Sequence, residues 1–354
     1  MPFRFSVYLD LIRTGAALLV FLSHAAYPRF PGGAPWVPAH LSHEAVVVFF
    51  VLSGYVIAYV AHERERTLRD YLISRAARIY PVVLASLALT WAIDMWRIGI
   101  GAPDSVPAYQ LAAPWKYLPL FLTFTNDIWF LNEDAFSNVP YWSLCYEVWY
   151  YIAFAAAFFL SGWLRYVAVG VVLAIMGPRL WLLFPLWLAG VAVYWLQRRA
   201  IPGCGASRVL FAGSLALLLT ILASGIDLRL DQAVNGLTGG WVGTHLRYSK
   251  WFAGDWLVAL LIAANIHAAR NAQIGFGVLA GAIGYFAGFS FSLYLLHFPL
   301  LQFFAQFSLP PLILLGAVLL SVWAVGLVVE QQKNRVRTML RRLFSSPCVT
   351  NPAS

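Results

Sequence analysis

A series of apolar stretches, each long enough to cross a bilayer as a helix, constrains this chain more than any other feature. The ten stretches lie at 9–27, 45–61, 79–97, 141–160, 164–180, 181–197, 209–225, 251–268, 283–306 and 312–331. Inside lipid every backbone N–H and C=O must be bonded within the protein, so such segments are helical. The sequence therefore predicts an all-α fold, a polytopic helical membrane protein with about ten transmembrane helices.

The composition agrees with this fold class and excludes others. Of the 354 residues 61% are hydrophobic and only 11% are charged, whereas soluble domains carry about 25% charged residues. An ordinary soluble enzyme, a disordered chain and a coiled coil are thereby excluded. Two regions leave the number of spans open: Gly177 and Pro178 could break one hairpin, and residues 116–131 could form a short or re-entrant segment.

The basic residues predict the orientation of the helices. If the N-terminus is cytoplasmic, 17 of the 24 Lys and Arg residues fall on the cytoplasmic side and 7 on the outer side. Cytoplasmic loops carry such an excess, so we expect both termini in the cytoplasm. The net charge of +9 then reflects topology and contact with the lipid bilayer, and we expect no nucleic-acid partner because no binding motif accompanies it.

Metal chemistry is not expected. The three cysteines lie far apart without a CxxC pair, which disfavours a disulfide framework or a thiolate zinc site. The segment HLSHE at 40–44 matches neither metalloprotease spacing, HExxH or HxxEH.

The first apolar stretch contains three ionisable residues, which are functional candidates wherever they occur inside a membrane. Arg13 and His24 are eleven residues apart, so on a helix both project from one face, about 16 Å apart along the axis. Asp10 joins that face at i, i+3 from Arg13. His24 could be a structural histidine bonded to a neighbour, or a general base, since neutral imidazole accepts a hydroxyl proton near physiological pH.

Two arginines follow the second apolar stretch. Arg75 and Arg78 stand at i, i+3, so on a helix both guanidinium groups face the same way. Pro81 can begin the next span, where its missing N–H does no harm. Two guanidinium groups beside a helix N-terminus form a phosphate site; the alternative is a basic loop that only sets topology.

The segment PYWSLCYEVWYY opens the fourth stretch with a polar set. It contains Trp142, Ser143 and Glu147, of which Ser143 and Glu147 share one helix face at i, i+4. Glu147 lies in an otherwise apolar helix start. It could be an interfacial carboxylate, could orient an imidazole, or could bind a polar substrate.

Two more stretches carry small or polar residues inside apolar helices. Ser290, Tyr294 and His297 fall on one stripe of the ninth stretch, where a lone histidine is commonly structural. Ser53 and Gly54 interrupt the second stretch, and small residues there allow close contact between helices.

Five segments together resemble the membrane acyltransferase 3 family, integral-membrane O-acyltransferases that modify bacterial polysaccharides, lipopolysaccharide, peptidoglycan and some small molecules. They occur in the family's order and cover nearly the whole chain: LDLIRTGAALLVFLSH with Arg13 and His24, FFVLSGYVI, RAARIYP, WSLCYE and SLYLLHFP. One position departs from the pattern. Many members have an aspartate shortly before FFVLSG, where this chain has Val47, with Glu44 three residues earlier.

The resemblance implies roles for these residues. Acyl-CoA, most commonly acetyl-CoA, would be the donor and would enter from the cytoplasm, with its phosphates near Arg75 and Arg78. His24 would be the catalytic base or a transient acyl carrier, and Arg13 would position the donor. Glu147 and His297 would support the imidazole or the acceptor, and Trp142 and Ser143 would bind the substrate.

The resemblance also implies the setting. Residues 1–342 would form the acyltransferase domain and 343–354 a short tail, in a bacterial cytoplasmic membrane. The acceptor would be a carbohydrate, and proteins of polysaccharide assembly would be partners. Two alternatives remain: a transporter or flippase of a glycan-related substrate, with Arg13, His24 and Glu147 along its path, and an accessory scaffold that binds substrate without chemistry.

Overall fold

The protein is described by a computed structural model that covers residues 1–30, 33–102 and 106–344. The predicted tail at 343–354 therefore lies almost entirely outside the described residues. The described chain is helical and forms no strand, which confirms the predicted fold class. The helices are α1 (Phe3–Ala25), α2 (Leu41–Glu63), α3 (Leu68–Gly99), α4 (Ala108–Ala112), α5 (Pro114–Leu122), α6 (Trp142–Phe159), α7 (Gly162–Arg199), α8 (Cys204–Ser224), α9 (Ile226–Leu237), α10 (Trp241–His245), α11 (Phe252–Ala269), α12 (Leu279–Ala287), α13 (Ser290–Phe304) and α14 (Pro311–Leu343), with 3-10 helices η1 (Val139–Tyr141), η2 (Arg247–Trp251) and η3 (Ala305–Phe307).

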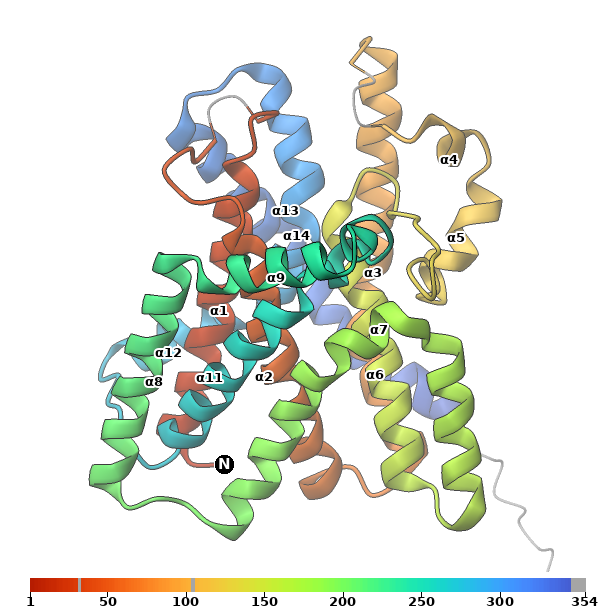
Figure 1. Ribbon diagram of the computed structural model, residues 1–354. Coiled ribbons are helices and arrows are strands. Elements are labelled where there is room, and N and C mark those ends of the chain that lie inside the picture. Colours follow the sequence, from red (N-terminus) through yellow and green to blue (C-terminus); the bar gives the residue numbers. More distant parts are fainter. Residues whose placement is uncertain (31–32, 103–105, 345–354) are drawn as a thin grey trace, which may run out of the picture.

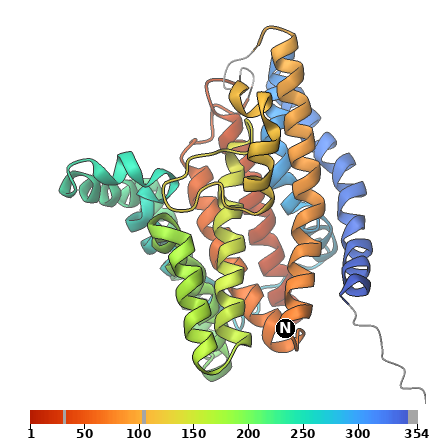
Figure 2. The same cartoon turned by 90° about the vertical axis from the view of Figure 1, so that its right-hand side faces the viewer.

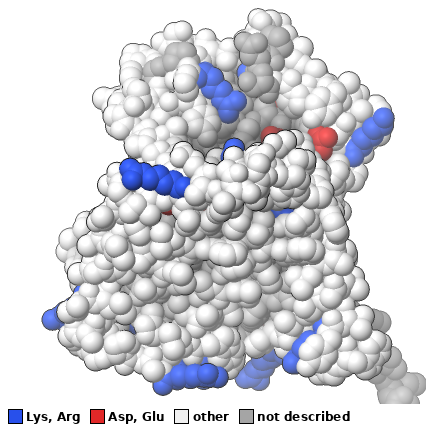
Figure 3. Space-filling view, in the orientation of Figure 1, with Lys and Arg blue, Asp and Glu red and all other residues white. Residues whose placement is uncertain are grey.

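The long helices stand side by side in one bundle (Figures 1 and 2). The start of α1 and the end of α14 lie at the same end of it, here called the terminal end. The short helices α4 and α5 lie toward the opposite, distal end, and α9 runs across the bundle. Figure 3 shows a broad face nearly free of charge between these ends, with Lys and Arg side chains at the terminal end and at the distal end. Such an uncharged band is typical of a membrane-spanning protein.

Seven helices of the described chain are long and apolar enough to cross a membrane, or eight if the bent pair α12 and α13 forms one span. The predicted count of ten is therefore not confirmed. One reason is that α7 covers two predicted stretches and breaks at Gly177 (φ 74°, ψ 177°), so that its two arms form a hairpin (Figure 1). Trp129 packs against this break, where a Cβ on Gly177 would lie 2.7 Å from the ring.

The expected position of Pro81 at the start of a span is wrong. Helix α3 begins at Leu68, and Pro81 lies inside it. Thr67 caps the helix by accepting a hydrogen bond from Asp70 N at 3.1 Å, and Tyr71 is fully buried on the inward face. The segment expected to be a loop therefore forms the first turns of α3, because a capped helix with one apolar face can pack against the bundle.

Two glycines set the contact between α2 and α7. A Cβ on Gly54 would lie 1.9 Å from the carbonyl oxygen of Trp187, and a Cβ on Gly190 would lie 1.9 Å from that of Val51. The two backbones thus touch at a distance that no other residue permits, which confirms the close helix contact predicted at Gly54. This contact fixes the neighbouring Ser53 in register with α7.

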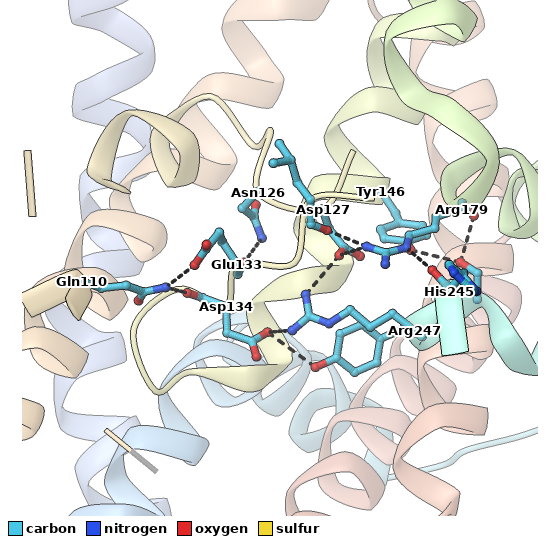
Figure 4. A network of polar contacts seen from close by, with 12 residues as sticks. Gln110, Asn126, Asp127, Glu133, Asp134, Tyr146, Arg179, His245 and Arg247 are labelled. Atoms are coloured by element: carbon cyan, nitrogen blue, oxygen red, sulfur yellow. Dashed lines mark hydrogen bonds and ion pairs between the residues drawn. The ribbon is translucent and has the colours of Figure 1, made fainter. Parts of the chain in front are cut away.

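Buried ion pairs hold the loop between α5 and η1 at the distal end (Figure 4). Asp127 Oδ1 accepts from Arg247 Nη1 at 3.0 Å and from Arg179 Nη1 at 3.2 Å. The second amino group of Arg247 binds Asp134 at 2.6 Å. Burial raises the pKa of the Asp127 carboxyl to about 6 despite these two arginines. The loop is therefore anchored to α7 and η2, which encloses the distal side of the bundle.

Candidate active site

The centre of the candidate site is a pair of histidines from α1 and α13. His24 Nδ1 lies 2.8 Å from His297 Nε2, and the two rings are nearly parallel, with centroids 5.1 Å apart. His297 is fully buried, and His24 keeps 7% of its surface exposed. Two candidates that lie 273 residues apart in the sequence thus form one unit.

The hydrogen bonds fix the tautomer of both rings. His297 Nδ1 lies 2.8 Å from the carbonyl oxygen of Leu293, which can only accept, so this nitrogen carries the proton. Nε2 of the neutral His297 ring is then an acceptor, and His24 Nδ1 donates to it. The free lone pair of His24 is consequently on Nε2, and the ring's hydrogen bond within the described chain is the one from Nδ1 to His297. This is the arrangement of a base whose tautomer is set by a second group.

Aromatic rings surround this pair. His24 makes edge contacts with Tyr27 and Phe298, at centroid distances of 5.2 and 5.3 Å, and Phe21 contacts His297 at 6.0 Å. The rings restrict the rotation of His24 and lower the local dielectric constant, and low polarity strengthens the hydrogen bond between the imidazoles.

A cavity of about 390 Å³ opens beside α1, α2 and α6. Its polar lining residues come from several of the predicted segments, and they are Ser6, Asp10, Arg13, Ser53, Tyr59, Arg64, Arg78, Ser143, Glu147, Tyr151, Ser290 and Tyr294. Met1 lines it as well, so the cavity reaches the terminal end. His24 and His297 do not line it. Tyr294 connects the two regions, since it lines the cavity and its ring lies 6.4 Å from that of His297.

Ser143 closes the cavity together with Tyr294. Their hydroxyl oxygens are 2.7 Å apart, and the Tyr294 hydroxyl also donates to the carbonyl oxygen of Pro140 at 3.0 Å. Both side chains are buried. The predicted stripe of Ser290, Tyr294 and His297 is thus present on α13, with its first two members at the cavity and the third at His24.

Glu147 lies in this cavity and makes no hydrogen bond to His24. Its Oε1 accepts from Ser53 Oγ at 2.8 Å and also from the hydroxyl of Tyr151, and Trp187 Nε1 donates to Ser53 Oγ at 3.2 Å. The carboxylate therefore joins the FFVLSG and WSLCYE segments. Its position fits a contact with a molecule inside the cavity and does not fit orientation of the imidazole.

Two of the three predicted arginines lie at the cavity, and the third is buried in the bundle. Arg13 lines the cavity and binds Asp10 at 2.7 Å. Arg78 also lines it, and within the described chain Arg78 makes no ion pair or hydrogen bond. Arg75 instead is buried and binds Glu65 at 2.9 Å. The structure thus brings Arg13 and Arg78 together at the cavity and separates Arg75 from them.

Trp142 faces away from the cavity. Its ring stacks on Tyr248 at a centroid distance of 4.4 Å and lies parallel to the ring of His43 at 5.9 Å. His43 Nε2 in turn binds Asp255 Oδ2 at 2.9 Å. Sequence reasoning missed this His43–Asp255 pair because the partners are 212 residues apart.

Glu44, three residues before Val47, is buried, and its Oε2 has no hydrogen-bond partner within the described chain. Over residues 1–30, 33–102 and 106–344 no group of three or more His, Cys, Asp or Glu side chains is placed to hold a metal ion.

Comparison with known proteins points to one class of chemistry. A family model described as an acyltransferase domain matches residues 6–329. Protein 2 in the picA locus of Rhizobium radiobacter is 33% identical over 162 residues, which are 42% of this chain and 78% of that protein. Acyltransferase MdmB of Streptomyces mycarofaciens is 29% identical over 154 residues, 40% of this chain and 36% of that protein. No solved structure matches.

Proposed function

The chain belongs to the acyltransferase 3 family, and on this basis we propose that it transfers an acyl group, in the first instance acetyl, from acyl-CoA to a hydroxyl group of a carbohydrate. It would do so in a bacterial cytoplasmic membrane, with both termini in the cytoplasm. The observation that carries the proposal is the pair of His24 and His297, in which the tautomer leaves Nε2 of His24 free as a base.

The proposed reaction is a single displacement at the thioester carbonyl. His24 Nε2 removes the proton from the attacking hydroxyl group as the new C–O bond forms. The tetrahedral intermediate collapses with cleavage of the C–S bond, and the imidazolium returns the proton to the sulfur of CoA. His297 accepts from His24 Nδ1–H throughout and so holds the imidazole in orientation, as the third group of a catalytic triad does.

The donor would occupy the cavity from the terminal end. A volume of about 390 Å³ is too small for a whole CoA molecule but suits its narrow pantetheine arm. The phosphates would then remain near the mouth, where Arg13 and Arg78 supply positive charge. Glu147 and Ser143 also line the cavity, where they can bind the amides of the arm, and Tyr294 connects the cavity with the histidine pair.

The proposal is tested with purified protein in lipid vesicles supplied with acetyl-CoA and bacterial glycan fractions. We expect release of CoA together with an acetyl ester on the glycan, detected by mass spectrometry, and loss of both in His24→Gln. Movement of a glycan across the vesicle membrane without CoA release would instead identify a transporter.

A further inference from the structure

Arg29 follows α1 and lies beside the candidate base. Its guanidinium carbon is 4.8 Å from the ring centroid of Phe298, 5.2 Å from that of Phe30 and 5.4 Å from that of Tyr27. Phe298 and Tyr27 are also the rings that contact His24. The same aromatic side chains therefore hold the guanidinium group and the imidazole next to each other.

The charge of Arg29 is held in place without being neutralised. Arg29 is exposed, and its side chain makes no hydrogen bond or ion pair with any residue that the structure describes. Asp134 and Tyr248 lie within electrostatic range but not in contact, and Asp134 is already bound by Arg247. Stacking on aromatic rings occupies the faces of a guanidinium group and leaves its N–H edge free to bind a carboxylate or a phosphate.

The location assigns Arg29 to the acceptor side. Helix α1 begins at the terminal end and ends at Ala25 toward the distal end (Figure 1), so Arg29 and the cavity arginines lie on opposite sides of His24. Figure 3 shows the surface hollowed between two lobes at the distal end, with basic and acidic side chains at its border. A donor phosphate bound at Arg13 and Arg78 would not also reach Arg29.

We infer that Arg29 binds an acidic group of the acceptor, so that the acceptor is an anionic sugar carrying a carboxylate or a phosphate. The inference rests on the proposed function and specifies its acceptor. A carboxylate or phosphate bound by the fork of Arg29 would place a hydroxyl group of the same sugar ring at Nε2 of His24, because the two side chains share their aromatic neighbours. Charge-assisted bonds of this kind are about twice as strong as neutral ones.

Three soluble acceptors that differ in charge test the inference in lipid vesicles with acetyl-CoA: methyl glucoside, methyl glucuronide and glucose 1-phosphate. We expect kcat/KM for at least one charged sugar to exceed that for methyl glucoside by about tenfold, the equivalent of about 1.4 kcal/mol. Arg29→Gln should remove the preference, and Arg29→Lys should retain part of it. Arg229→Gln is the matched control, since Arg229 on α9 is exposed and its side chain has no partner in the described chain.

The results that would overturn the inference about Arg29 differ from the result that would refute the proposed function. The inference is overturned if the wild type shows no preference for either charged sugar, if it accepts none of the three, or if the preference persists in Arg29→Gln. A uniform loss on all three sugars would overturn it too, because it would show that Arg29 holds lipid phosphate or the loop. Acetyl-CoA turnover that depends on His24 is measured in parallel; its absence from the wild type would refute the proposed function itself.

Discussion

Replacement of His297 by alanine isolates the contribution of the second histidine. In the protein His24 Nδ1–H donates to His297 Nε2 at 2.8 Å, at a site where His297 is fully buried. Without His297 this donor is left without its partner, and a buried unsatisfied donor costs about 1–3 kcal/mol. The ring is also free to adopt the other tautomer, in which Nε2 carries the proton and cannot act as a base.

If that cost appears in the transition state, kcat falls about 5- to 150-fold, since about 1.4 kcal/mol is tenfold in rate. The KM for acetyl-CoA should not change, because His297 does not line the cavity. Steady-state acetyl transfer by purified protein in vesicles measures both constants. His245→Ala is the matched control: His245 is exposed, and its imidazole contacts Trp241, through a hydrogen bond to the carbonyl oxygen and stacking on the ring.

The reasoning is refuted if His297→Ala inserts and unfolds at the wild-type temperature yet keeps kcat within about twofold. It is also refuted if the loss falls on the KM for the donor. His297→Gln serves as a second variant, because its amide oxygen can accept from His24 Nδ1 and should restore part of the rate.

Three further predictions follow from the same contacts. Arg78→Gln should raise the KM for acetyl-CoA about tenfold or more, since a charged hydrogen bond contributes about 1.5–3 kcal/mol. The KM for acetyl-pantetheine, which has no phosphate, should change little. Equal effects on both donors would contradict this prediction. Gly54→Ala should destabilise the protein by about 1–3 kcal/mol, the cost of overpacking, because its Cβ would meet the carbonyl oxygen of Trp187 at 1.9 Å. The control is Gly15→Ala, which has open space around its Cβ and should not lower the unfolding temperature. Burial raises the pKa of Asp231 in α9 from 3.8 to about 7, so the folded state favours the protonated carboxyl group. The stability that depends on this protonated form is present at low pH and is lost as the pH rises through about 7. Asp231→Asn, which keeps an acceptor for Gly254 N, should therefore raise the unfolding temperature at pH 8 but not at pH 4, and an equal shift at both would be inconsistent with burial as the cause.

The sequence predicted the fold class and most of the candidate residues because the bilayer imposes simple rules. The length of the apolar stretches predicted the helices, and the polar residues within those stretches indicated His24, Glu147 and His297 as candidates. The number of spans could not be predicted as well, since length and hydropathy do not show a break such as Gly177 or a bend such as the 57° between α12 and α13.

Which candidates touch one another could not be read from local spacing. His24 and His297 meet because α1 and α13 pack together, and no periodicity within either helix indicates that contact. Spacing was also misleading for Arg75 and Arg78. Residues at i, i+3 are still about 60° apart around a helix, which is enough for Arg78 to face the cavity and Arg75 to face Glu65.

The contacts of Glu147 likewise could be predicted only within its own helix. Its i, i+4 relation to Ser143 was predicted, and both residues line the cavity. The hydrogen bond to Ser53, 94 residues away, depends on the packing of α2 against α6, and that contact places the carboxylate in the cavity rather than at the imidazole.

The most direct test of the account is the acetyl transferred by His24→Ala in membranes that contain the same amount of inserted protein as the wild type. The account requires transfer from acetyl-CoA to fall to the level of membranes without the protein, while binding of acetyl-CoA persists. Transfer at a rate close to that of the wild type would show that the imidazole is structural and that the chemistry lies elsewhere.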